Sequence, residues 1–160
     1  MVHAILAIFL LLTPAQAQIS CTASDQSCDF YQCMEEQQPC GAKGYWLRFG
    51  APYCKVFLRD QAQFSLRSQA WLQSVRLCLQ ERIGEVSAHQ TCSGIYSEAM
   101  HSHVGCYVDT GFCQLSTREK FRVYWYLKGA LRDARTWQEA QLLNEACIRT
   151  YGPEAAVNLH

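Results

Sequence analysis

The feature of this sequence that most restricts its fold is a set of ten cysteines, none adjacent to another. An even number of cysteines in a chain that opens with a secretion signal indicates a framework of disulfide bonds. We therefore expect five bridges, although ten cysteines can pair in several hundred ways and spacing alone does not select one set. The ten positions are Cys21, Cys28, Cys33, Cys40, Cys54, Cys78, Cys92, Cys106, Cys113 and Cys147.

The start of the chain has the pattern of a signal peptide. Positions 4–12 are an unbroken apolar run, and the small residues at 15–17 suit signal peptidase. We expect a signal peptide over residues 1–17 and a single secreted domain over residues 18–160. The apolar run is shorter than the roughly 20 residues that cross a bilayer, so no membrane span is expected.

The spacing of apolar residues predicts an all-α fold. In residues 68–83, Leu72, Val75, Leu79 and Ile83 recur at intervals of three or four residues and form one apolar stripe. The stretches 39–44 and 49–52 are rich in Gly and Pro and are expected to be loop. The further helices are expected near 28–37, 52–64, 92–107, 116–132 and 136–150. The prediction is a disulfide-stapled bundle of about five or six helices.

The helix expected from residue 116 has the clearest start signal. Ser116 and Glu119 have the spacing of a capping box, in which each side chain bonds to the other residue's backbone N–H. Phe121, Tyr124 and Leu127 are expected to form its apolar side.

The intervals between cysteines and the residues around them carry a family resemblance. From Cys28 onward the intervals are 5, 7, 14, 24, 14, 14, 7 and 34 residues. The local segments that agree are Tyr53-Cys54-Lys55-Val56-Phe57-Leu58, Trp71-Leu72, Cys78 and Cys106-Tyr107 with Cys113. Over residues 21–147 these features resemble the stanniocalcins, a family of secreted helical hormones.

The resemblance implies both a disulfide pairing and a function. It implies a hormone or paracrine regulator that acts by binding an extracellular protein partner or receptor. The family's roles are calcium and phosphate homeostasis and the inhibition of pappalysin-type metalloproteases, which it can capture through a cysteine. The implied pairs are Cys21 with Cys33, Cys28 with Cys54, Cys40 with Cys92, Cys78 with Cys106, and Cys113 with Cys147.

The sequence departs from the stanniocalcins near its C-terminal end. The family's interchain cysteine lies after the other ten, and nothing corresponds to it after Cys147. No Asn-x-Ser/Thr glycosylation site occurs, since Asn144 and Asn158 lack the required third residue. The family's tail is also longer, whereas this chain stops at His160. A covalent homodimer is therefore not expected.

The segment between Cys40 and Cys54 is longer than its counterpart in the family. It holds the aromatic residues Tyr45, Trp46 and Phe49. Two interpretations remain open: these rings are a contact surface for a partner, or they pack against the bundle.

The distribution of charge argues against nucleic acid as a partner. The formal net charge is zero, so neither nucleic acid nor a polyanion is expected as the main partner. Residues 115–135 nevertheless hold six Lys or Arg against Glu119 and Asp133. This segment is either a solvated helix face or a docking face for an acidic partner.

The sequence contains no candidate catalytic residues. The adjacent cysteines and the helical His-Asp pair of secreted phospholipase A2 are missing from the sequence. The Gly-x-Ser-x-Gly and His-Glu-x-x-His motifs are missing as well. An even cysteine count leaves no free thiol as a nucleophile. His101 and His103 point about 200° apart on one helix, so they cannot bind one metal ion together. We expect no enzyme activity, no cofactor and no metal.

One alternative to a protein-binding regulator remains. A secreted, disulfide-rich helical domain can also be a carrier or interaction module for a small hydrophobic ligand. The Cys-x-x-x-Cys pair of insect odorant-binding carriers is missing from this sequence.

Overall fold

The described part of the chain is built from helices. The structure is a computed structural model that describes residues 20–88 and 90–157, and no strand occurs among them. The expected signal peptide lies outside the described residues. The six α-helices of this part are α1 (Asp29–Gln37), α2 (Ala51–Arg59), α3 (Leu66–Ser87), α4 (Cys92–Asp109), α5 (Thr117–Leu127) and α6 (Ala134–Tyr151). The prediction of an all-α, disulfide-stapled bundle is confirmed.

Short helical segments connect the long ones. A π-helix, η1 (Trp46–Gly50), runs directly into α2. The remaining segments are the 3₁₀ turns η2 (Gln61–Gln63), η3 (Phe112–Gln114), η4 (Ala130–Arg132) and η5 (Pro153–Ala155).

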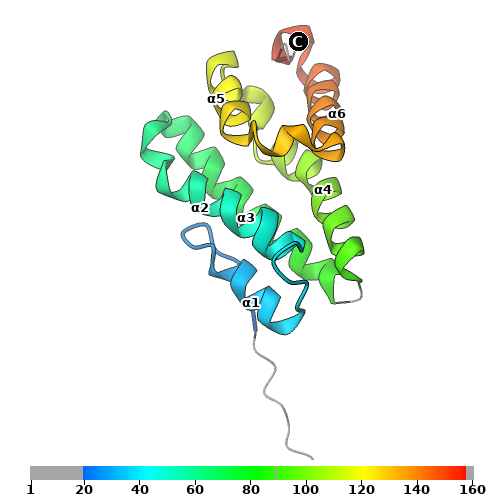
Figure 1. Ribbon diagram of the computed structural model, residues 1–160. Coiled ribbons are helices and arrows are strands. Elements are labelled where there is room, and N and C mark those ends of the chain that lie inside the picture. Colours follow the sequence, from blue (N-terminus) through cyan, green and yellow to red (C-terminus); the bar gives the residue numbers. More distant parts are fainter. Residues whose placement is uncertain (1–19, 89, 158–160) are drawn as a thin grey trace, which may run out of the picture.

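The helices are arranged around the pair α3 and α4 (Figure 1). α3 and α4 pack against each other, and α6 packs on α4. α1 and α2 cover α3 on one side, while α5 also contacts α2. The bundle therefore has an α1 and α2 side and an α5 and α6 side, joined by α3 and α4.

Capping residues set the helix boundaries where the sequence predicted them. The side chain of Ser116 accepts from the Glu119 N–H, and the Glu119 carboxylate accepts from the Ser116 N–H, which completes the capping box. Simpler N-caps start α4 and α6: the Thr91 side chain accepts from the Gly94 N–H, and the Asp133 carboxylate accepts from the Arg135 and Thr136 N–H groups. After α6 the chain turns at Gly152, whose φ of 91° is open to glycine without strain.

The expectation of a loop over 49–52 is wrong. These residues lie in η1 and the first turn of α2, where Pro52 occupies an early helical position. Gly50 is needed for packing rather than for a turn. A Cβ built there would lie 2.5 Å from Cδ1 of Tyr31, so the ring can approach only a glycine.

The expected apolar side of α5 is correct except for Phe121. Tyr124 and Leu127 are buried, but Phe121 is 58% exposed. Lys120 occupies the inward position instead, because its ammonium group reaches two buried carbonyl oxygens. The inward side of α5 therefore differs from the predicted one near its start, where Lys120 is buried in place of Phe121.

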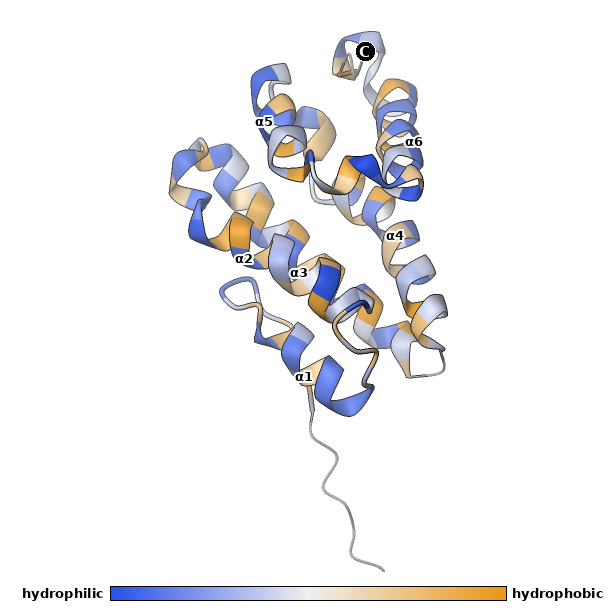
Figure 2. Cartoon of the chain, viewed as in Figure 1, coloured by the Kyte–Doolittle hydropathy of each residue, from blue (hydrophilic) through white to orange (hydrophobic). Residues whose placement is uncertain are grey.

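The buried side chains form two clusters. Every helix carries both apolar and polar residues along its length (Figure 2). The first lies among α2, α3, α4, α5 and α6 and includes Trp71, Phe112 and Val123. The second lies among α1, η1, α3 and α4 and includes Trp46 and Ile95. Both clusters draw on α3 and α4, which places the boundary between them inside the bundle.

All ten cysteines are paired. The first bridges hold the N-terminal segment and α1 to one another and to α2; the others join the loop before η1 to α4, α3 to α4, and η3 to α6. The pairs are Cys21 with Cys33, Cys28 with Cys54, Cys40 with Cys92, Cys78 with Cys106, and Cys113 with Cys147. These are the five pairs that the stanniocalcin resemblance implies.

Candidate functional site

The aromatic residues considered for partner contact lie largely in the core. Trp46 is 0% exposed and Tyr45 is 3% exposed, whereas Phe49 is half-buried. The Tyr45 ring stacks on Phe49 at 6.0 Å between centroids, and the Trp46 ring meets Phe30 edge-on at 6.5 Å. The contact interpretation is wrong for Tyr45 and Trp46, because rings this deeply buried cannot reach a partner. Packing against the bundle is what the structure has.

A cavity of about 90 Å³ lies between the two core clusters. Residues of all six α-helices of the described part and of η1 and η4 line it, and most of them are aromatic or aliphatic. Its lining includes Tyr31, Tyr45, Phe49, Tyr53, Phe57, Trp71, Leu72, Val75, Leu79, Val104, Tyr107, Tyr124, Leu127 and Leu143. An apolar cavity that holds benzene has a volume of about 150 Å³, so this one is smaller than a single ring requires.

Several polar atoms at the cavity wall have no hydrogen-bond partner among the described residues. They are Trp71 Nε1, Arg76 Nε, Tyr124 Oη and Glu139 Oε2, and all four residues line the cavity. Buried polar groups are normally hydrogen-bonded. The cavity wall therefore combines a carbon-rich surface with a few polar groups whose bonding capacity is unused within the protein.

The cavity wall also carries an uncharged imidazole. His103 Nδ1 lies 2.5 Å from the Ala99 carbonyl oxygen, so Nδ1 carries the proton and Nε2 is the acceptor. Burial lowers the pKa of His103, and it outweighs the opposing effect of hydrogen bonds with the Ala99 and Met100 carbonyls. Burial also raises the pKa of Tyr107 and Tyr124 well above its usual range. These three side chains are neutral at pH 7 and suit an uncharged ligand.

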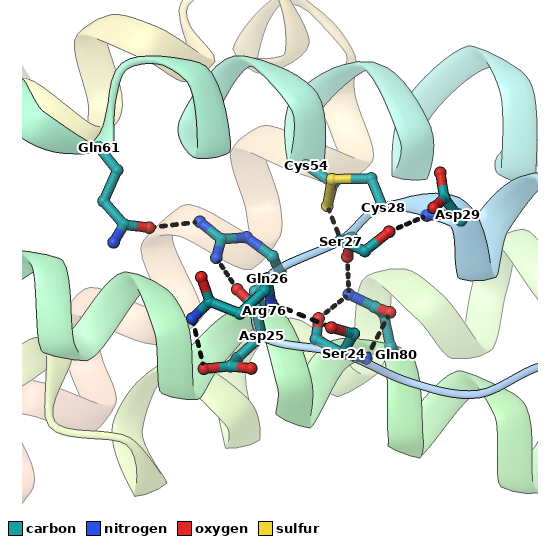
Figure 3. Close-up of a disulfide and its surroundings, with 10 residues drawn as sticks. All are labelled: Ser24, Asp25, Gln26, Ser27, Cys28, Asp29, Cys54, Gln61, Arg76 and Gln80. Atoms are coloured by element: carbon teal, nitrogen blue, oxygen red, sulfur yellow. Dashed lines mark hydrogen bonds between the residues drawn. A yellow bond between two sulfur atoms is a disulfide. The ribbon is translucent and has the colours of Figure 1, made fainter.

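Arg76 is a charged residue of the cavity wall, and its side chain is hydrogen-bonded to the N-terminal segment (Figure 3). Its guanidinium donates to the Asp25 carbonyl oxygen and, at 3.0 Å, to Gln61 Oε1. One turn along α3, the amide of Gln80 accepts from the Ser24 N–H at 3.1 Å and donates to the Ser24 carbonyl at 2.8 Å. The segment beside Cys28 is thus held on α3 by polar bonds and on α2 by the Cys28 to Cys54 disulfide.

Sequence reasoning did not identify Arg76 and Gln80 as inward residues. Both are buried, although the apolar stripe of α3 assigns charged and amide side chains to solvent. The partners that bury them are backbone groups more than 50 positions earlier in the chain. No signal local to α3 identifies such partners.

Neither a metal cluster nor a membrane helix is found in the described ranges. Among residues 20–88 and 90–157, no group of three or more His, Cys, Asp or Glu side chains is placed to hold a metal ion. Within the same ranges, no helix has both the length and the apolar character needed to cross a bilayer. His101 and His103 lie on α4 as expected, with only His103 at the cavity.

No protein-family model, no curated protein and no solved structure matches this chain. The resemblance to the stanniocalcins is therefore carried by the cysteine intervals, the residues around them and the pairing.

Proposed function

We propose that this protein is a secreted, non-catalytic regulator of the stanniocalcin type that acts by binding an extracellular protein. The observation that carries the proposal is the bridge pattern. In chain order the cysteines pair first with third, second with fifth, fourth with seventh, sixth with eighth and ninth with tenth. This is the one set, among several hundred, that the resemblance implies.

The disulfides also support an extracellular location. Disulfide bonds form and persist in oxidising compartments and are rare in the cytosol. Five of them tie every α-helix except α5 to another part of the fold. A domain reinforced to this degree is typical of a protein that works outside the cell.

The proposed mode of binding is non-covalent. Every one of the ten cysteines is paired, so none is free to form a bridge with a partner. A pappalysin-type metalloprotease is the partner class that the resemblance implies. Inhibition of such an enzyme by this protein would be reversible.

The proposal is tested by adding the oxidised, secreted protein to a pappalysin-type metalloprotease that is cleaving its protein substrate. We expect dose-dependent inhibition that dilution reverses, and no adduct on a non-reducing gel. The protein after reduction and alkylation is the control and should not inhibit. Full activity of the protease in the presence of the oxidised protein would contradict the proposed partner, and a covalent adduct would contradict the proposed mode.

A second candidate function, that of a carrier for a small hydrophobic ligand, is favoured by the cavity. Its walls are largely apolar, and Trp71 and Tyr124 offer it buried polar atoms without partners. The ligand class would be an uncharged molecule of at most one ring with one hydrogen-bonding group. A ring needs more than the 90 Å³ of the cavity, so its binding would require the walls to move apart, and p-cresol is the probe that tests this.

The carrier function is tested by thermal unfolding with and without p-cresol. A ligand present at a free concentration of 100 times its dissociation constant stabilises the folded state by about 2.7 kcal/mol, which gives a clear rise in Tm. Val104→Phe, at the cavity wall, should abolish the rise, whereas the same substitution at exposed Val86 should preserve it. An equal rise in both variants would show that p-cresol binds elsewhere.

A further inference from the structure

Two basic segments far apart in the sequence meet at one surface groove. The groove has a volume of about 1030 Å³ and is lined by the loop before η1, the start of α4, and the η4 to α6 connection. Lys43, in the loop before η1, and Arg48, in η1, line it together with Arg132 and Arg135 of the η4 to α6 connection. All four side chains are exposed.

The charge of the groove is unbalanced even though the net charge of the chain is zero. Among the described residues, none of these four basic side chains forms an ion pair with a carboxylate. The single acidic residue of the groove lining is Asp133. Its carboxylate already accepts from the Arg135 and Thr136 N–H groups as the cap of α6, and from the Tyr96 hydroxyl at 3.1 Å. The groove is therefore strongly cationic.

The N-terminus of α4 adds to this positive potential, whereas the Asp133 carboxylate offsets that of α6. α4 begins at Cys92 and α6 begins at Ala134, both residues line the groove, and both helices are 18 residues long. The N-terminus of a helix carries roughly half a positive charge, which favours bound anions. Four basic side chains and the N-terminus of α4 thus act on the same volume.

The groove also offers aromatic surface. Phe49, Tyr53 and Tyr96 line it, and the Arg135 guanidinium lies 5.5 Å from the centroid of the Tyr96 ring. The C–H faces of sugar rings pack on aromatic rings, while guanidinium groups bind sulfate oxygens through paired N–H donors. This combination suits an anionic sugar chain better than an acidic peptide.

We propose that this groove binds a sulfated polysaccharide chain. The ligand lies along the groove with its sulfate groups on Lys43, Arg48, Arg132 and Arg135 and its sugar rings against the aromatic floor. This site is separate from the protein-binding function proposed above and would hold the protein near the cell surface or matrix. Binding depends on local charge, so it weakens steeply as salt rises.

The experiment is a titration of a fluorescent heparin octasaccharide with the full secreted protein at several salt concentrations. Arg132→Gln/Arg135→Gln should weaken binding by about three- to thirtyfold. It should also reduce the slope of log affinity against log salt by about two, one for each lost contact. The matched control is Arg82→Gln/Arg118→Gln, which removes the same charge from exposed positions outside the groove lining. This control should bind within about twofold of the wild type.

Three outcomes would overturn the proposal. The first is no binding of the octasaccharide at physiological salt. The second is equal weakening in the groove and control variants, which would indicate non-specific attraction. The third is equally tight, groove-dependent binding of an oligoglutamate of the same charge, which would assign the groove to an acidic protein. None of these outcomes alters the metalloprotease test, so the two proposals fail independently.

Discussion

At the scale of single residues, Glu119 and Lys120 depart most from the interpretation of residues 115–135 as a solvated face. Lys120 is buried, and its ammonium donates to the Cys113 carbonyl at 2.7 Å and the Ala155 carbonyl at 2.8 Å. Glu119 accepts from Ser65 and Ser116, the caps of α3 and α5. Adjacent residues thus connect α5 to η3, η5 and the start of α3.

Replacement of Lys120 by Met should destabilise the protein. The substitution keeps an unbranched side chain only one atom shorter but leaves two buried carbonyl oxygens without a donor, which costs about 1–3 kcal/mol. Urea unfolding would measure the loss, and Lys55→Met on the exposed face of α2 is the control, expected to change stability by less than about 0.5 kcal/mol. Unchanged stability in Lys120→Met would mean that water replaces the ammonium group at no cost.

Glu119 should contribute a pH-dependent part of the stability. Burial alone would raise the pKa of this carboxyl, but hydrogen bonds from Ser65, Ser68 and Ser116 outweigh it and lower the pKa to about 2. A lowered pKa stabilises the fold above the unfolded value near 4.5, and this contribution is lost as the pH falls from about 4.5 to 2. Because the residue lies near the surface and is only partly buried, its effect should be about 1 kcal/mol or less.

The measurement is the unfolding free energy of wild type and Glu119→Gln between pH 2 and pH 7. The difference between the two proteins should be largest above pH 5 and should shrink towards zero at pH 2. A difference that stays constant over this range would show that the charge of Glu119 is not what the serine hydroxyls stabilise.

At the scale of helices, the entry into α2 is the element that local sequence signals misjudge. Gly and Pro at 50 and 52 are typical of a loop. In the structure the missing Cβ of Gly50 gives room to the Tyr31 ring, and Pro52 begins a helix. The glycine is explained by a residue of α1, which lies outside any window used to predict α2.

Gly50→Ala should therefore destabilise the protein although alanine favours helix. The new Cβ would meet the Tyr31 ring at 2.5 Å, and the resulting displacement of a buried ring costs about 1–3 kcal/mol. Gly105→Ala, in α4 with no atom within 4 Å of the new Cβ, is the matched control and should stabilise by about 0.5–1 kcal/mol. Thermal unfolding of the two variants should give shifts of opposite sign; shifts of the same sign would argue against the close approach of Tyr31.

At the scale of the whole molecule, the Cys78 to Cys106 bridge joins the two helices around which the others pack. A disulfide of this loop length is worth about 2–4 kcal/mol. Cys78→Ala or Cys106→Ala alone should block secretion, because each also leaves a reactive thiol beside the core. Ser74→Ala, on the exposed face of α3, should leave the yield unchanged. Yields can be compared by immunoblot of the medium, and a double cysteine variant secreted at wild-type yield would count against this bridge.

The cationic groove and the cavity belong to the same scale, because neither lies within one element. Lys43 and Arg135 are separated by most of the chain and share a groove only because α4 and α6 begin beside the loop before η1. The zero net charge is correct as a sum, yet it conceals a local excess of positive charge. A sum over the sequence has no information on position in space.

The sequence by itself determined the helical class, the capping box at Ser116, the long helices α3, α4 and α6, and an even set of cysteines. These depend on periodicity and on neighbours a few residues away, which a linear pattern records. Only the tertiary structure decided that the polar side chains of Arg76 and Lys120 point inward. It decided as well that Tyr45 and Trp46 belong to the core. It also decided where the cavity and the cationic groove form. Those outcomes depend on partners distant in the chain, whose proximity exists only after the helices pack.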